Sequence, residues 1–233
     1  MTEVQRFEVG GVSLGVRVWA CRRPVHRAVV LLPGTGLTAT DWDVVAGDLS
    51  QDRTVHAVDL RGHGESGRPG TYSIELMTAD VESLLPQLGE DFDLVGHSLG
   101  GLVACRVAAR SSAIRNLVLE DVGLIRPRRP SMPSRPRGDL PFDWSMVEQV
   151  RPEIDVPGSD WADVLRRITA SVLAIGGGPR SFVPQEWVAD LVDTVPSGRL
   201  VTIDAGHEIH ATRPTEFLAA VHGFLDTSGS GAP

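Results

Sequence analysis

The stretch Phe92-Asp93-Leu94-Val95-Gly96-His97-Ser98-Leu99-Gly100-Gly101 decides the fold of this chain. Residues 92–95 are typical of a buried strand, and the small and apolar residues 99–110 predict a helix directly after it. Residues 96–100 between them match Gly-x-Ser-x-Gly, whose glycines remove side chains that would clash in so sharp a turn. The turn would lift Ser98 clear of the backbone at the N-terminus of the helix, where the peptide dipoles favour developing negative charge. This context predicts that Ser98 is a nucleophile.

Strand-like and helix-like segments alternate along almost the whole chain. Apolar runs that do not alternate with polar residues are buried on both faces, and helices between them imply parallel pairing. We therefore expect a doubly wound, mostly parallel α/β sheet, with ligands bound at the carboxyl ends of the strands. The expected strands are 12–20, 28–32, 55–59, 93–96, 117–119, 172–175 and 200–203, and the expected helices are 73–88, 99–110, 185–195 and 214–225.

Several motifs together resemble those of the α/β-hydrolase family. Residues 31–36 are similar to the oxyanion loop after its third strand, and residues 59–66 to the loop after its fourth. Ser98 stands in the turn after the fifth, and Ala205-Gly206-His207 follows the last strand, where the family carries its histidine. The resemblance covers about residues 10–225. It implies a single α/β-hydrolase domain over 1–226, followed by a flexible Ser/Gly-rich tail at 227–233.

His207 is the expected general base. A serine hydroxyl is a poor nucleophile until a base takes its proton, and His207 follows the last predicted strand, at the same edge as Ser98. His210 is expected to be a rim or structural residue. By resemblance, the backbone N–H groups of Thr35 and Leu99 form an oxyanion hole for a tetrahedral intermediate.

The acid that would orient His207 departs from the resembled family. The family usually places an aspartate after its seventh strand, but residues 175–184 contain no carboxylate. Some members carry the acid one strand earlier, where this chain has Glu120 and Asp121. We expect Glu120 to fill the role, because similar sequences have the acid directly after the strand's last apolar residue. Asp121 is the second choice, and a site without an acid stays open.

A Pro- and Arg-rich insert interrupts the alternation, and we expect a lid over about residues 123–165. Arg126, Arg128 and Arg129 could attract an anionic substrate or a phosphopantetheine-bearing carrier protein, or could simply be solvated. Aromatic residues gather in and after the insert and could line an acyl pocket or form the lid's own core. The candidate substrate-binding residues are His97, Phe142, Trp144 and Trp161.

Composition narrows the function classes. The formal net charge of -8 argues against a nucleic-acid binder. No stretch approaches the roughly 20 apolar residues of a membrane-spanning helix, and the N-terminus lacks a signal-peptide pattern, so we expect a cytoplasmic protein. Cys21 and Cys105 cannot form a disulfide framework or a CxxC site. The spacing of His207 and His210 does not fit HExxH. No metal or cofactor is implied, and the oligomeric state stays open.

The reaction expected from these residues is hydrolysis of a small-molecule ester or thioester through an acyl-serine. Relatives of similar sequence also use such a serine for lactone opening, C–C bond cleavage, acyl transfer and lyase or cyclase steps. An alternative of another class is a small-molecule receptor on a hydrolase scaffold. The missing carboxylate in residues 175–184 favours that alternative, whereas Ser98, His207 and the glycines of the turn argue against it.

Overall fold

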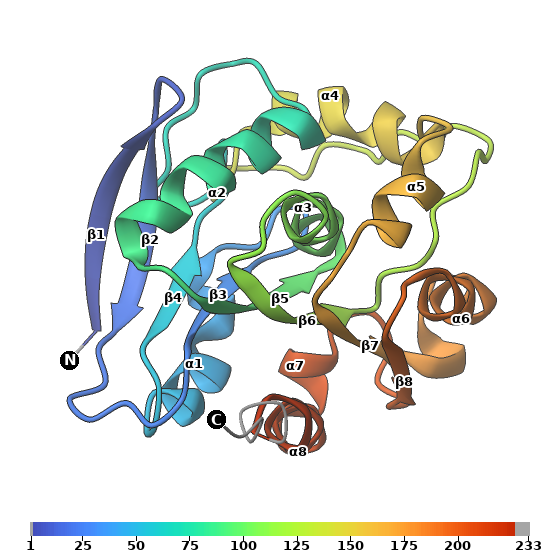
Figure 1. Ribbon diagram of the computed structural model, residues 1–233. Coiled ribbons are helices and arrows are strands. Elements are labelled where there is room, and N and C mark those ends of the chain that lie inside the picture. The colour runs from blue at the N-terminus through green and yellow to red at the C-terminus, as the bar shows by residue number, and fades with distance from the viewer. Residues whose placement is uncertain (1, 227–233) are drawn as a thin grey trace.

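The computed structural model describes residues 2–226, so the tail expected at 227–233 lies outside the described residues. Within that range the strands form one eight-stranded sheet of order β1-β2-β4-β3-β5-β6-β7-β8 (Figure 1). β1 pairs antiparallel with β2 and β2 with β4, and all other pairs are parallel. The expected doubly wound, mostly parallel sheet is confirmed. Its strands are β1 (Thr2–Val9), β2 (Val12–Trp19), β3 (Ala28–Leu32), β4 (Val55–Val58), β5 (Phe92–His97), β6 (Ile114–Glu120), β7 (Ser171–Gly176) and β8 (Gly198–Thr202).

Helices cover both faces of the sheet. In Figure 1, α2 to α5 lie on one face, whereas α1, α7 and α8 lie on the other. None of the helices within residues 2–226 is long and apolar enough to cross a membrane. The helices are α1 (Asp43–Leu49), α2 (Ile74–Leu88), α3 (Ser98–Ala108), α4 (Trp144–Asp155), α5 (Trp161–Arg166), α6 (Gln185–Thr194), α7 (Ile209–Thr212) and α8 (Pro214–Leu225), with short 3-10 turns at Ala39–Trp42 and Gly178–Arg180.

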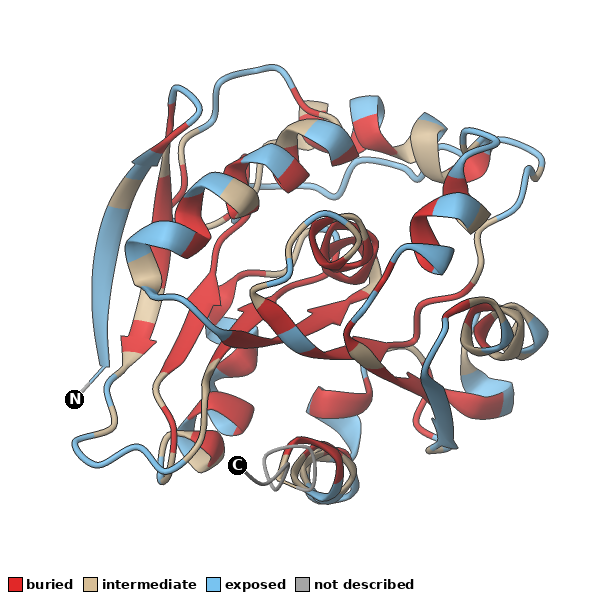
Figure 2. Cartoon of the chain, viewed as in Figure 1, coloured by how far each residue is buried: buried red, intermediate tan, exposed pale blue. Residues whose placement is uncertain are grey.

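Alternate residues of the central strands feed two separate cores. Val30 and Leu32 of β3 pack in the core beneath α2 and α3, whereas Val29 and Leu31 pack in the core beneath α1 and α8. Because both faces are covered, these strands have no polar face, which explains their continuous apolar runs. Figure 2 shows this burial along the central strands and the contrasting exposure of the two edge strands, β1 and β8.

The insert between β6 and β7 crosses the face that carries α2 and α3. Residues 122–141 run without helix or strand, and the backbone then returns to the loop after β4, where Asp143 N–H donates to Gly62 O at 2.7 Å. Helix α4 follows and buries Met146, Val147 and Val150 in the same core as α2 and α3. The second half of the insert is therefore packed against the sheet's own helices.

Candidate active site

A sharp turn joins β5 to α3 and presents Ser98. Ser98 has φ 51°, a left-handed conformation that non-glycine residues seldom adopt. The turn needs its glycines, because a Cβ on Gly96 would lie 2.6 Å from Gly100 O, and one on Gly100 would collide with Leu32 O. The Gly-x-Ser-x-Gly pattern therefore stands in the strand–turn–helix context that lifts a serine side chain out of the backbone.

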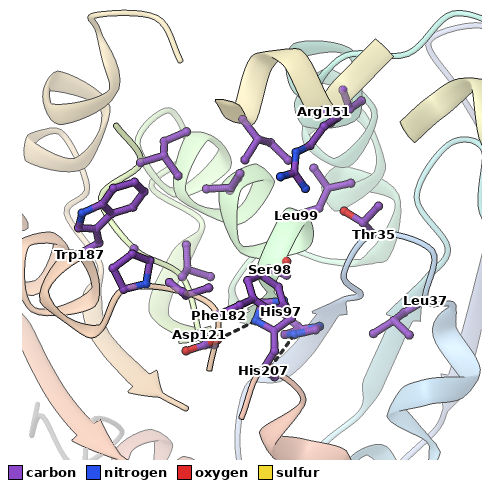
Figure 3. Close-up of a pocket in the computed structure, with 18 of the residues that line it drawn as sticks. Thr35, Leu37, His97, Ser98, Leu99, Asp121, Arg151, Phe182, Trp187 and His207 are labelled. Carbon is purple, nitrogen blue, oxygen red and sulfur yellow. Dashed lines mark hydrogen bonds and ion pairs between the residues drawn. The ribbon is translucent and has the colours of Figure 1, made fainter. Parts of the chain in front are cut away.

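Ser98 opens into a cavity of about 320 Å³ at the carboxyl ends of the parallel strands (Figure 3). The loops after five strands contribute to its wall: Thr35 follows β3, Ser98 follows β5, Asp121 follows β6, Phe182 follows β7 and His207 follows β8. Parallel strands bring these loops together although they are far apart in sequence.

His207 is oriented by Asp121. Its Nδ1 lies 2.7 Å from Asp121 Oδ2, so the ring carries its proton at Nδ1 and leaves Nε2 free to accept one. Asp121 has φ 50°, and Ser98 and Asp121 are the two non-glycine residues with positive φ in residues 2–226. Strained backbone is thus concentrated at the nucleophile and at its candidate acid, as is common in active sites.

The loop after β7 holds the Asp121 carboxylate in place. Gly177 N–H donates to Oδ1 at 2.9 Å, and the Ser181 hydroxyl donates to Oδ2. Burial opposes the negative charge, but hydrogen bonds from His207, Ser181 and Gly177 outweigh it and lower the pKa of Asp121. The loop that lacks a carboxylate of its own therefore supplies the donors for the carboxylate of the neighbouring strand.

Glu120, the residue expected to orient His207, contacts His210 instead. Its Oε2 lies 2.8 Å from His210 Nδ1, and its Oε1 accepts from His210 N–H at 2.8 Å. The cause is strand alternation, because Glu120 is the last residue of β6 and lies on the same face as Val118, above α7 and α8. Asp121 stands beyond the strand, where the positive φ turns its carboxylate to the cavity edge. In this structure Asp121, the second choice from the sequence, contacts His207 and Glu120 does not, so we take Asp121 as the candidate acid.

Replacing Glu120 with glutamine is expected to destabilise the fold in a pH-dependent way. Burial opposes the charge on both partners. Nevertheless, the charge and hydrogen bonds of His210 help to lower the pKa of Glu120 below 4.5, and Glu120 raises the pKa of His210 above 6.5. The Glu120 contribution is present above pH 4.5 and is lost as pH falls through the lower folded pKa. The His210 contribution is present below pH 6.5 and is lost as pH rises through the higher folded pKa. Between these values we expect a loss of about 3 kcal/mol, or a fall in Tm of about 6–12 °C.

Thermal unfolding of Glu120→Gln and wild type across pH 5 to 9 measures this effect. The deficit should be largest near pH 5.5 and shrink at alkaline pH. Glu216→Gln is a matched control, because Glu216 is an exposed carboxylate that pairs with Arg213 at 3.7 Å. An equal deficit at every pH would show that the charge on the buried pair does not contribute.

His97 supports the loop that carries His207. Its Nε2 lies 3.0 Å from His207 O, and the two rings lie 4.6 Å apart between centroids. Burial lowers the pKa of His97 to about 4, so the ring is neutral at pH 7 and donates its Nε2 proton to that carbonyl. Three atoms of the kinds that bind metal ions lie within 4.8 Å of one another, one each from His97, Glu120 and His210. Both carboxylate oxygens of Glu120 are already hydrogen-bonded to His210. We therefore interpret the cluster as a structural contact that holds residues 207–210 in place.

The remaining predicted residues divide into two groups. Thr35, Leu99 and His97 line the cavity. Phe142, Trp144 and Trp161 do not line this cavity, so of the two alternatives left open by the sequence, their contacts favour packing within the fold over an acyl pocket. Trp161 is buried in the main core below Arg106, and Phe142 packs against His63 and Gly36. Trp144 Nε1–H donates to Glu148 within α4.

Among the residues of the cavity wall that the sequence analysis did not name, Phe182 and Arg151 bear most on the chemistry. Phe182 is 72% exposed and its ring lies over that of His207, with centroids 4.1 Å apart. Arg151, on α4, lines the cavity together with Arg128. An apolar residue in the loop after β7 could have been flagged, since that loop ends at the same sheet edge as Ser98. Nothing in the sequence distinguishes Arg151 from other arginines on helices.

The sheet, the turn at Ser98 and the loops around it define the α/β-hydrolase class of fold. Residues 29–221 match the model of the alpha/beta hydrolase family, so the chain belongs to that family and is a hydrolase-class enzyme. It is 28% identical to an esterase of Mycobacterium tuberculosis over 97% of this chain and 90% of the relative. A 44% identical match to a pimeloyl-[acyl-carrier protein] methyl ester esterase of Klebsiella pneumoniae spans 34% of this chain and 30% of the relative. The enol-lactonase of Burkholderia xenovorans has the same fold, with a TM-score of 0.83 at 22% identity over 95% of this chain and 100% of that chain.

Proposed function

We propose that this protein hydrolyses a small-molecule ester or thioester through an acyl-enzyme on Ser98. One observation carries the proposal: Ser98, in its left-handed turn, lines the same cavity as His207. The Nδ1 atom of His207 is in turn hydrogen-bonded to the Asp121 carboxylate. The full-length similarity to a protein named an esterase supports an ester as the substrate class.

Acylation would begin when Ser98 Oγ attacks the ester carbonyl carbon. His207 Nε2 takes the hydroxyl proton, and the resulting imidazolium is stabilised by the ionised Asp121 at 2.7 Å. The backbone N–H groups of Thr35 and Leu99 would donate hydrogen bonds to the oxyanion. The Leu99 amide is free to do so because the first turn of α3 has no intrahelical acceptor for it. His207 then returns the proton to the leaving oxygen or sulfur as its bond to the carbonyl carbon breaks.

Deacylation repeats these steps with water as the nucleophile. His207 Nε2 takes a proton from water, the hydroxide attacks the acyl carbon, and the proton returns to Ser98 Oγ as the ester bond to the enzyme breaks. Among residues 2–226, Ser98 and His207 share the cavity without a hydrogen bond between them. Hydrogen bonds of this kind often form only when substrate is bound.

A serine-directed fluorophosphonate tests the proposal. The folded wild-type protein is expected to gain the mass of one adduct on the peptide that contains Ser98, and heat-unfolded protein is expected to gain none. Hydrolysis of a panel of p-nitrophenyl esters and acyl thioesters should accompany labelling. Absence of both the adduct and turnover would reject the hydrolase and favour a small-molecule receptor that keeps an idle serine.

A further inference from the structure

Two arginines of the insert are fixed in the wall of the Ser98 cavity. Arg128 and Arg151 both line it. Arg128 Nε donates to Asp155 Oδ1 at 2.7 Å, and Arg151 Nε donates to Asp155 Oδ2 at 2.9 Å. The Asp155 side chain is 1% exposed and also accepts from Ser131 N–H at 2.9 Å. One buried carboxylate thus anchors both guanidinium groups and restricts their rotamers.

The anchored arginines leave charge and hydrogen-bond donors unused. Each arginine contacts Asp155 through Nε. In the described part of the chain, the Nη1 and Nη2 atoms of both arginines have no hydrogen-bond partner. Burial opposes the charge on Asp155, but bonds from Arg151, Ser131 and Arg128 lower its pKa to about 2, so it stays ionised. Two guanidinium groups over one carboxylate give this wall a net positive charge, with paired donors suited to a carboxylate.

The positive wall stands at the opposite end of the cavity from His207. In Figure 3, Ser98 lies between Arg151 and His207. The acidic residues of the lining, Asp121 and Glu208, belong to the His207 end, so the cavity is polarised along its length. A leaving group must lie beside His207, which protonates it. The wall formed by Arg128 and Arg151 is thus placed to face the acyl chain of a substrate on Ser98 rather than its leaving group.

The size of the cavity limits the length of that acyl chain. Small-molecule sites usually range from about 300 to 1,000 Å³, so a volume of about 320 Å³ is at the small end. Ile154, Val147 and Leu102 line the space as well and give it apolar sides. These dimensions suit a short aliphatic chain that carries an anion at its far end.

We propose that Arg128 and Arg151 form a carboxylate-binding subsite, and that the substrate is an ester whose short acyl chain ends in a carboxylate, such as a monoester of a dicarboxylic acid. The inference deepens the proposed hydrolysis and rests on it. Of the three arginines that the sequence suggested could attract an anionic substrate, only Arg128 lines the cavity. Arg126 pairs with Asp190 at 2.5 Å, Arg129 is exposed, and neither lines the cavity.

Matched esters test the subsite through kcat/KM. Monomethyl glutarate carries the carboxylate, and methyl 5-methylhexanoate replaces it with an isopropyl group of similar shape. Wild type is expected to prefer the charged ester at least tenfold, and Arg151→Gln and Arg128→Gln should each lower that ratio about tenfold or more. Arg151→Lys should retain part of the preference. Arg166→Gln is the matched control, because Arg166 is exposed and pairs with Asp163 on the surface.

Two further measurements separate the possible failures. The acetyl ester of 3-hydroxypropanoate carries its carboxylate on the alcohol side, and a wild-type preference for it over monomethyl glutarate would overturn the assignment to the acyl chain. Calorimetric titration of monomethyl glutarate into Ser98→Ala measures the subsite without turnover. If Ser98→Ala binds monomethyl glutarate, the added Arg151→Gln substitution abolishes that binding, and wild type hydrolyses no ester, the subsite would be supported and the hydrolase rejected. Hydrolysis of both methyl esters at equal efficiency would reject the subsite alone.

Discussion

Replacing Ser98 with alanine is expected to lower kcat for the best ester substrate by about a million-fold and to abolish fluorophosphonate labelling. The nucleophile, base and acid act as a unit, so removal of the nucleophile alone costs about as much as removal of all three. The remaining rate would come from the oxyanion hole and from substrate binding. Steady-state kinetics and intact mass measure the two effects.

Ser112→Ala is the control for this substitution, because Ser112 is exposed in the turn after α3. It should keep both labelling and kcat. The melting temperature of Ser98→Ala should stay near that of wild type, because alanine inherits the same left-handed backbone (φ 51°) and loses only the hydroxyl. An adduct that persists on Ser98→Ala, or a kcat within tenfold of wild type, would place the nucleophile elsewhere.

The layered fold is largely predictable from the sequence, since burial on both faces leaves a strong apolar pattern. The seven expected strands all occur, with small shifts of their ends. β1 was not expected, because it is an edge strand whose residues are mostly exposed and which is held by backbone pairing to β2. Helices α1 and α7 were also missed: they span 7 and 4 residues, too short for a clear helical period.

The choice between Glu120 and Asp121 as the candidate acid depends on strand geometry, which motif spacing does not capture. Leu117 and Leu119 face one core and Val118 the other, so alternation alone assigns Glu120 to the Val118 face, away from the cavity. That signal was present in the sequence. The left-handed turn at Asp121 was not, because φ at a polar residue after a strand depends on the loops packed around it.

The cavity lining was the least predictable part of the site. Phe142, Trp144 and Trp161 drew attention as aromatic residues, but each packs against other parts of the chain. Arg151 enters the cavity because Asp155, one helical turn later, holds its Nε together with that of Arg128. Such a contact between an irregular segment and a helix depends on how the insert folds back on the sheet.

Replacing Asp121 with asparagine is expected to lower kcat by about ten-thousand-fold while KM changes little. The asparagine amide can donate to His207 Nδ1, which would move the ring proton to Nε2, the atom that must accept the Ser98 proton. Asparagine also lacks the negative charge that stabilises the imidazolium. Single-turnover and steady-state kinetics on one ester, with fluorophosphonate labelling rates, measure the loss.

Glu120→Gln supplies the decisive comparison, because the two carboxylates are adjacent in sequence and contact different histidines. It should reduce kcat far less than Asp121→Asn when both are measured below their melting temperatures, since Glu120 acts on residues 207–210 only through His210. Its main effect should be on stability, whereas Asp121→Asn should act on the chemical step. A larger loss of kcat in Glu120→Gln would instead restore Glu120 as the acid, and would require the end of β6 to rearrange when substrate binds.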